Sequence, residues 1–177
     1  MKILKKILLG LLALIAILLV IAVFLPSRYH VQRRIVIQAK PDAIYPWVNN
    51  IKKWADWTAW TKDRDPTLNF SYEGPSEGTG AISKWDGKKT GNGMMTFTES
   101  NPATGVKYDL SFEHGKYKSV GGISFEPSGD GTQVTWVDDG ELGANPVSRY
   151  FGLAMDNMIG PDFEAGLQKL KQKVESK

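Results

Sequence analysis

The fold is decided by the last long stretch of the chain, which reads NPVSRYFGLAMDNMIGPDFEAGLQKLKQKV from Asn145 to Val174. Asn145 can cap the free amides of a first helical turn, and Pro146 suits the next position because it has no N–H to leave unpaired. Apolar side chains then recur at intervals of three and four, the pattern of a helix that covers a core. They are Phe151, Met155, Met158, Ile159, Phe163, Leu167, Leu170 and Val174. The spacing predicts a long C-terminal helix across a sheet, kinked or restarted at Gly160-Pro161.

The other end of the chain carries a long apolar run. Residues 7–25 contain no charged or polar side chain and follow three lysines in the first six residues. At about 1.5 Å per residue, the run forms a helix of roughly 28 Å, close to the bilayer's hydrocarbon thickness of about 30 Å. A cleaved signal peptide would have a shorter apolar core and small residues at its cut site, which the sequence before Pro26 lacks. We therefore expect an uncleaved transmembrane anchor in residues 1–26 that contacts the lipid bilayer through residues 7–25.

Residues 27–177 are the size of one ordinary domain, and Ser27 to His30 is the only spacer between it and the anchor. Basic residues flank the anchor on both sides, so the positive-inside rule gives only a small bias in orientation. We expect a short cytoplasmic N-terminus and a domain on the extracytoplasmic side of the membrane. The whole chain has a net charge of +3, but the anchor holds three of the lysines and no acid, which leaves 19 basic and 19 acidic residues in the domain. A neutral domain argues against nucleic acid as a partner.

The middle of the chain predicts an antiparallel sheet. Val31 to Gln38 is rich in β-branched residues, and Pro41 then opens a helical segment. From Leu68 onward the apolar period changes to two, with short turns that exclude parallel pairing. Alternation is strictest where Val106, Tyr108, Leu110 and Phe112 interleave with polar residues. We expect an α+β fold in which a curved antiparallel sheet of six or seven strands is covered by the C-terminal helix.

Three tryptophans, Trp54, Trp57 and Trp60, follow the helical segment at intervals of three. We favour a structural aromatic plug as their role, and the alternative is that they line the mouth of a pocket. The sequence offers little for catalysis, since it has two histidines and no cysteine. We therefore expect no catalytic residue, no metal site and no cofactor. The acidic residues after Trp136, including Asp138, are expected to form a solvated strand end.

An ordered set of motifs covers nearly all of residues 31–174. It comprises Ile37 to Trp47, Trp54-Ala55-Asp56-Trp57 with Trp60, Gly78-Thr79-Gly80 leading to Trp85, Gly93 to Glu99, Gly131 to Trp136, and Ile159 to Leu167. In these motifs the chain resembles the START-like (SRPBCC) superfamily, in its polyketide cyclase/dehydrase and lipid transport branch. The resemblance implies a helix-grip fold, in which the sheet curls around the C-terminal helix. One fold hosts many functions, so it points to no single activity.

The leading hypothesis is a membrane-anchored module that binds an apolar small molecule or lipid between the sheet and the C-terminal helix. Its expected ligand-binding residues are Trp57, Trp60, Phe70, Trp85, Met95, Phe97, Tyr108, Leu110, Phe112, Trp136, Phe151, Met155 and Met158. The first alternative is an enzyme of the cyclase or hydrolase type, which predicts a buried polar pair such as Tyr108 and Asp138. The second is a protein-interaction module, which predicts an exposed apolar patch instead of a cavity.

Overall fold

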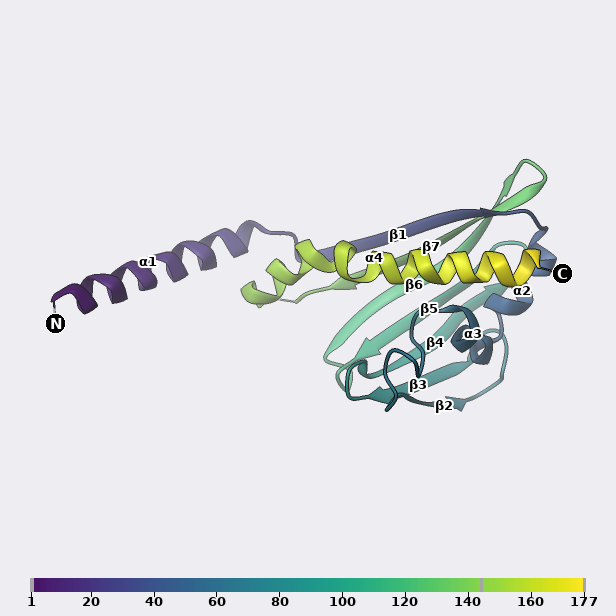
Figure 1. The fold of residues 1–177 in the computed structure, drawn as a ribbon, viewed down its shortest axis with the longest axis horizontal. Helices are drawn as coiled ribbons and strands as arrows, with labels where there is room; N and C mark the ends of the chain where they lie inside the picture. The colour runs from purple at the N-terminus through teal and green to yellow at the C-terminus, as the bar shows by residue number, and fades with distance from the viewer. Residues whose placement is uncertain (1, 144, 177) are drawn as a thin grey trace.

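The structure is a computed structural model that describes residues 2–143 and 145–176 (Figure 1). Its elements, in chain order, are α1 (Lys2–Phe24), β1 (Arg28–Ile37), α2 (Pro41–Val48), the 3-10 helix η1 (Ile51–Lys53), α3 (Trp54–Trp57), β2 (Asn69–Glu73), β3 (Ile82–Gly87), β4 (Gly91–Asn101), β5 (Gly105–Phe112), β6 (Tyr117–Ser128), β7 (Gly131–Glu141) and α4 (Pro146–Glu175). The seven strands form one antiparallel sheet in the order β1-β7-β6-β5-β4-β3-β2. The predicted α+β class and antiparallel sheet are confirmed.

The sheet begins closer to α1 than predicted. β1 starts at Arg28, whose pairing with Glu141 at the end of β7 is the first of ten consecutive register pairs. Most of the expected spacer Ser27–His30 is therefore strand, because the long β7 offers hydrogen-bonding partners to the whole segment. Only Leu25, Pro26 and Ser27 separate α1 from the sheet.

α4 begins and ends as the sequence predicts. The Asn145 side chain accepts a hydrogen bond from the Val147 amide at 2.9 Å, which is the expected cap. The sheet bends around α4, with β1 and β7 on one side of it and β2, β3 and β4 on the other (Figure 1). The helix continues through Pro161, so the alternative of a restart there is wrong. After Pro161 the helix is held on the sheet by buried side chains such as Phe163 and Leu167, and before it Met155 and Ile159 are partly buried against the same core. This packing outweighs the one hydrogen bond that proline removes.

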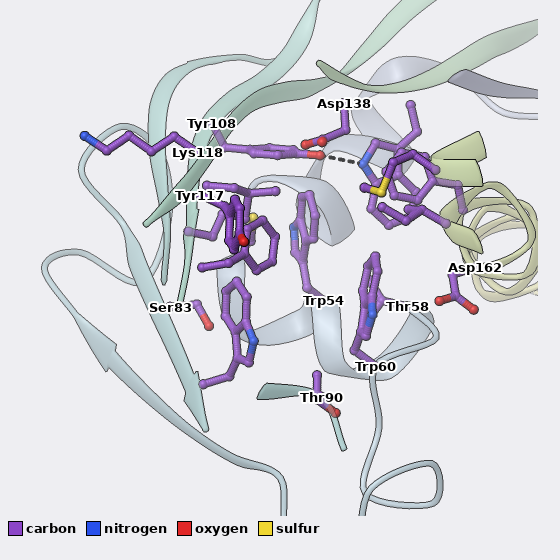
Figure 2. A pocket seen from close by; sticks show the side chains of 18 of the residues that line it. Trp54, Thr58, Trp60, Ser83, Thr90, Tyr108, Tyr117, Lys118, Asp138 and Asp162 are labelled. Atoms are coloured by element: carbon purple, nitrogen blue, oxygen red, sulfur yellow. Dashed lines mark hydrogen bonds between the residues drawn. The ribbon is translucent and has the colours of Figure 1, made fainter. Parts of the chain in front are cut away.

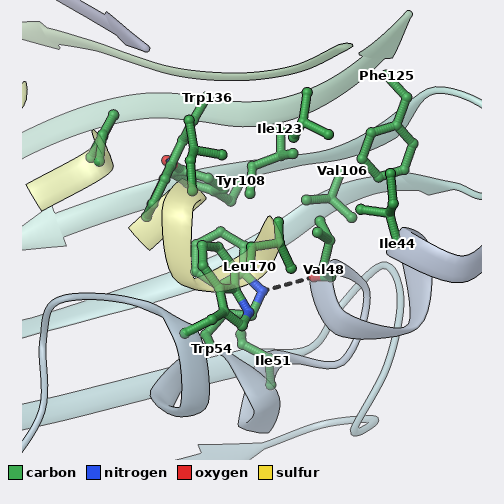
Figure 3. Packing of buried hydrophobic residues seen from close by; sticks show 14 of the residues in the cluster. Ile44, Val48, Ile51, Trp54, Val106, Tyr108, Ile123, Phe125, Trp136 and Leu170 are labelled. Atoms are coloured by element: carbon green, nitrogen blue, oxygen red, sulfur yellow. Dashed lines mark hydrogen bonds between the residues drawn. The ribbon is translucent and has the colours of Figure 1, made fainter. Parts of the chain in front are cut away.

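The solid core lies under the C-terminal half of α4. Phe163, Leu167 and Leu170 are almost fully buried there, and Phe163 stacks on Trp136 with ring centroids 4.1 Å apart and planes 3° from parallel. Figure 3 shows how α2 and α3 close this core, with the Trp54 indole donating to the Val48 carbonyl at 2.7 Å. The predicted apolar stripe of α4 is therefore a packing surface from Phe163 onward.

α1 projects from one end of the sheet (Figure 1). It is long and apolar enough to cross a membrane, and its large apolar side chains are exposed. Ala22 is the one buried residue of this helix.

We predict that a chain starting at Ser27 still folds, because α1 contributes no large side chain to the core. Thermal unfolding of this truncation, followed by near-UV circular dichroism, should remain cooperative, with some fraying at the start of α4. The full chain in detergent is the control. A truncation without near-UV signal would contradict the boundary between residues 1–26 and 27–177.

Candidate ligand-binding cavity

A cavity of about 440 Å³ lies between the sheet and the N-terminal half of α4. This volume is within the usual range of small-molecule sites, about 300 to 1,000 Å³. α4 contributes Ser148, Phe151, Met155, Ile159, Asp162 and Phe163 to the wall. The other side chains are mostly aromatic or aliphatic and come from β1 to β7 and the α3 region (Figure 2). The wall therefore begins where the solid core ends, at Phe163.

Ten of the thirteen expected binding residues line this cavity. They are Trp60, Phe70, Trp85, Met95, Tyr108, Leu110, Phe112, Trp136, Phe151 and Met155. That they contact a ligand remains a prediction. Trp57, Phe97 and Met158 do not line the cavity.

Trp57 and Phe97 are core residues. Trp57 is fully buried, and its indole donates to the Trp47 carbonyl at 3.1 Å. α3 is a single turn, so the three tryptophans do not share one helical face. Phe97 faces inward like Met95 but is covered by Trp54, whose ring centroid is 5.7 Å away. Trp54 lines the cavity in its place, together with Trp60, so the tryptophan cluster is both a plug and a wall.

Met158 is on the outside of α4, with 59% of its surface exposed. At about 100° per residue, Met158 lies about 60° around the helix from Met155 and about 140° from Phe163. The expectation that Met155 and Met158 share the inward face is therefore wrong. Ile159, four residues after Met155, occupies the inward position instead.

One polar group is buried in the apolar wall. The carboxylate of Asp138 accepts hydrogen bonds from the hydroxyls of Tyr29 at 2.9 Å and Ser119 at 3.0 Å, and the residue is only 3% exposed. The expectation of a solvated strand end is wrong for Asp138. In β7, Val134, Trp136 and Asp138 alternate with outward residues, so the inner face continues through the acidic segment. The same alternation was readable in the sequence, whereas Tyr29 was missed because it fell in the expected spacer.

Burial sets the titration of this group. Desolvation raises the pKa of Asp138 to about 6, although hydrogen bonds from Tyr29 and Ser119 favour the ionised form. Burial and the neighbouring carboxylate together raise the pKa of Tyr29, so its hydroxyl stays a donor at neutral pH. The cavity therefore contains a carboxylate that gains or loses a proton near physiological pH.

Tyr108 supplies a second buried hydroxyl. Its oxygen accepts a hydrogen bond from the Trp136 indole at 2.8 Å, drawn in Figure 2 beside Asp138. Complete burial, with the charge of Asp138 adding to it, raises the pKa of Tyr108 well above its usual value. The cavity thus combines the two residues that the enzyme hypothesis names, each buried and each with a perturbed pKa.

Two glycines make room for the tyrosine rings. Gly140 pairs with Tyr29 across β1 and β7, and a side chain at Gly140 would collide with that ring. Gly121 pairs with Tyr108 and leaves the space that its ring occupies. Each aromatic ring can therefore lie flat across its partner strand and direct its hydroxyl toward the neighbourhood of Asp138.

Within residues 2–143 and 145–176, no group of three or more His, Cys, Asp or Glu side chains is placed to bind a metal ion. His30 pairs with Asp139 at 2.7 Å on the exposed side of the sheet. The carboxylate and hydroxyls around Asp138 are the concentrated polar feature of the cavity wall.

We predict that Asp138 makes stability depend on pH. Its pKa is higher in the folded chain than the ordinary 3.8, so its contribution is fully present below about pH 4 and is lost as pH rises through 6. Between about pH 3.5 and 8, wild type should lose about 3 kcal/mol of unfolding free energy relative to Asp138→Asn. Urea unfolding at both pH values measures this difference. Asp109→Asn, on the exposed face of β5, should follow wild type, and parallel curves for wild type and Asp138→Asn would refute the assignment.

The fold recurs in solved structures. Protein TTHA0849 from Thermus thermophilus is 17% identical, with a TM-score of 0.60 and coverage of 83% of this chain and 97% of its own. StfQ, a di-domain ARO/CYC protein from the steffimycin biosynthetic pathway, is 10% identical with a TM-score of 0.64, over 85% of this chain and 51% of its own. The Aha1 dimer from Colwellia psychrerythraea is 16% identical with a TM-score of 0.54, over 82% and 96% respectively. At these identities the likeness shows the fold alone.

No curated protein matches the chain. The family model described as "Polyketide cyclase / dehydrase and lipid transport" matches residues 28–175, which is more than four fifths of the sequence. The match starts at the first residue of β1 and ends at the last residue of α4, so it spans the whole sheet, the cavity and the helix that covers them. The chain therefore belongs to the polyketide cyclase/dehydrase and lipid transport family.

Proposed function

We propose that this protein is held in a membrane by α1 and binds a hydrophobic small molecule or lipid in the cavity under α4. The observation that carries the proposal is a cavity of about 440 Å³ with an aromatic and aliphatic wall and a single buried carboxylate. An apolar wall with a few convergent polar groups is the usual form of a small-molecule site. The protein-interaction alternative expects an exposed patch in place of such a cavity.

The wall suits an apolar ligand of variable shape. Met95 and Met155 line it from opposite sides, and methionine adapts to irregular surfaces. Trp54, Trp60 and Trp85 offer broad apolar faces for rings or chains. The energy of binding would come from removing the ligand's apolar surface from water.

Asp138 would orient the ligand. Tyr29 and Ser119 each use one lone pair of the carboxylate, and an ionised carboxylate has about four. The remaining acceptor capacity favours a ligand that carries a hydroxyl or amine donor at one end. We infer that the ligand is amphipathic, with its donor on Asp138 and its apolar body along the aromatic wall.

The anchor proposal rests on the length and hydropathy of α1 and on the exposure of its side chains. Exposed apolar side chains along the whole of a 23-residue helix are unfavourable in water and favourable in lipid. We place the domain on the extracytoplasmic side, as expected for an N-terminal signal anchor.

An acid–base enzyme is the second candidate. Asp138 has a pKa of about 6 inside the cavity, close to the pH at which a general acid or base works best. Perturbed carboxyl groups in cavities are enriched at catalytic sites. Asp138→Asn would then abolish turnover of a substrate that the variant still binds through the apolar wall, whereas in a pure binding protein the bound molecule is recovered unchanged.

We predict that filling the cavity abolishes binding. Leu110→Trp places a larger side chain in the wall and should remove binding of the apolar fluorophore N-phenyl-1-naphthylamine, measured by titration, and any lipid found by mass spectrometry of extracts of purified protein. Met158→Ala is the matched control, because Met158 is exposed and outside the cavity. Equal fluorophore binding by Leu110→Trp and wild type would exclude this cavity as the site.

We predict that truncating a residue of the cavity wall costs less unfolding free energy than truncating a residue of the solid core. Met155→Ala enlarges an existing space and should cost about 1 kcal/mol of unfolding free energy, whereas Leu170→Ala, in the solid core, should cost about 2 to 5 kcal/mol. Met158→Ala should stay within about 0.5 kcal/mol of wild type. Chemical denaturation of the three variants provides the comparison, and a core-sized loss in Met155→Ala would argue against an open cavity at that point.

A further inference from the structure

The first turns of α4 have an unusual surface. From Pro146 to Met155 the helix contains one charged residue, Arg149. Val147, Phe151 and Leu153 are each 55 to 59% exposed, and Met158 continues the exposed apolar surface one turn later. Beyond Met158 the exposed face of α4 carries mostly polar and charged side chains, among them Glu164, Gln168, Lys169 and Lys173. The apolar surface is thus confined to the end of α4 that adjoins α1.

Two side chains join this end of α4 to α1. Arg149 donates from Nη1 to the carbonyl oxygens of Val23 at 2.7 Å, Ala22 at 3.3 Å and Leu25 at 3.4 Å. These carbonyls belong to the last turn of α1, where they lack helical partners and where a positive charge is favourable. The Tyr150 hydroxyl donates to the Leu18 carbonyl at 2.6 Å. α4 therefore begins alongside α1, not beyond its end.

The contact between Tyr150 and Leu18 shows how far along α1 the start of α4 reaches. Leu18 lies seven residues before Leu25, which corresponds to roughly 10 Å along the helix axis. If residues 7–25 span the hydrocarbon layer, the Tyr150 hydroxyl reaches below the membrane surface. Tyrosine is enriched at the membrane interface, where its hydroxyl can reach a polar partner, and arginine can extend its charge along an apolar stem to polar groups near the membrane surface. The exposed apolar side chains of the first α4 turns then face lipid and not water.

The cavity rim lies at the same end of the sheet. Phe151 lines the cavity while being 59% exposed, so it forms part of the rim. The other exposed lining residues on this side are Lys118 and Glu141, which face each other across β6 and β7. Glu141 also faces Arg28, the first residue of β1. This row is separated from α1 by three residues. Glu141 forms an ion pair with Arg28 at 2.9 Å, so the row Arg28, Glu141 and Lys118 carries one net positive charge toward lipid phosphates.

We infer that the segment of α4 from Pro146 to Met158 lies in the membrane interface and that the cavity opens onto the bilayer, so that its ligand is an amphipathic molecule taken directly from the lipid phase. The part that concerns the ligand rests on the proposed binding function, whereas the membrane contact of α4 does not. The occupant of the apolar surface is lipid because Arg149 and Tyr150 hold this part of α4 beside α1, whose large apolar side chains are also exposed.

The membrane contact is tested on the full chain in phosphatidylcholine vesicles. The sequence has no cysteine, so Val147→Cys, Met158→Cys and Gln168→Cys each provide a single site for a nitroxide label. Labels at 147 and 158 should be relaxed more by oxygen than by a water-soluble nickel chelate in electron paramagnetic resonance measurements. The label at 168, on the exposed charged half of α4, should show the reverse. The same water accessibility at all three positions would overturn the inference.

Ligand loading is tested by kinetics. Val147→Glu/Met158→Glu changes exposed side chains that do not line the cavity, so equilibrium binding of N-phenyl-1-naphthylamine by the detergent-solubilised full chain should match wild type. In vesicles preloaded with the fluorophore, the double variant should take it up at least threefold more slowly. Equal uptake rates would refute loading from the bilayer. Absence of fluorophore binding by wild type in detergent would refute the proposed binding function itself. The nitroxide measurement tests the membrane contact of α4 independently of ligand binding and of ligand uptake.

Discussion

The parallel stack of Phe163 on Trp136 separates the solid core of the domain from its cavity. Its centroids are 4.1 Å apart, and Gly166, one turn later, brings α4 close enough to the sheet for the rings to meet. On the far side of the stack, Leu167, Leu170 and Val174 of α4 are buried, and the helix contacts α2 and α3. On the near side, the same helix stands away from the strands and leaves the cavity. One long helix therefore provides both the core and the roof of the site, and the aromatic pair marks the boundary between them.

A buried carboxylate in an apolar wall is costly, and the fold compensates for it locally. Two hydroxyls donate to Asp138, and two cross-strand glycines, Gly140 and Gly121, leave the space in which the rings of Tyr29 and Tyr108 lie. The compensation is incomplete, because the pKa of Asp138 remains raised to about 6. For stability alone, a hydrophobic residue of similar size could often replace such a group at little loss. A partly compensated charge that faces a cavity is what a binding or reactive group requires.

Much of this arrangement could be predicted from the sequence. Alternation in the strands and the capped, three-and-four spaced helix were sufficient for the class, the antiparallel sheet and most of the cavity wall. The errors have specific causes. Met158 is three residues from Met155, but the turn of about 100° per residue places it on the outward side of α4. Phe97 points to the inner face of β4, as its alternation predicts, but Trp54 lies between it and the cavity. The alternation in β7 also places Asp138 on the inner face, but the acidic residues beside it led to the prediction of a solvated strand end. Tyr29 was missed because register with β7, a long-range pairing, extends β1 toward the anchor.

The connection between α1 and β1 is three residues long, and Arg149 and Tyr150 join a second helix to α1. With α1 in a bilayer, as proposed, a domain held at two points so near the lipid surface has little freedom to swing outward. It is therefore poorly suited to ferrying cargo across the gap between two membranes, a task that requires a long tether or none. Under the proposed function, its geometry suits work within one leaflet, where a captured molecule is removed from lateral diffusion in the plane of the membrane.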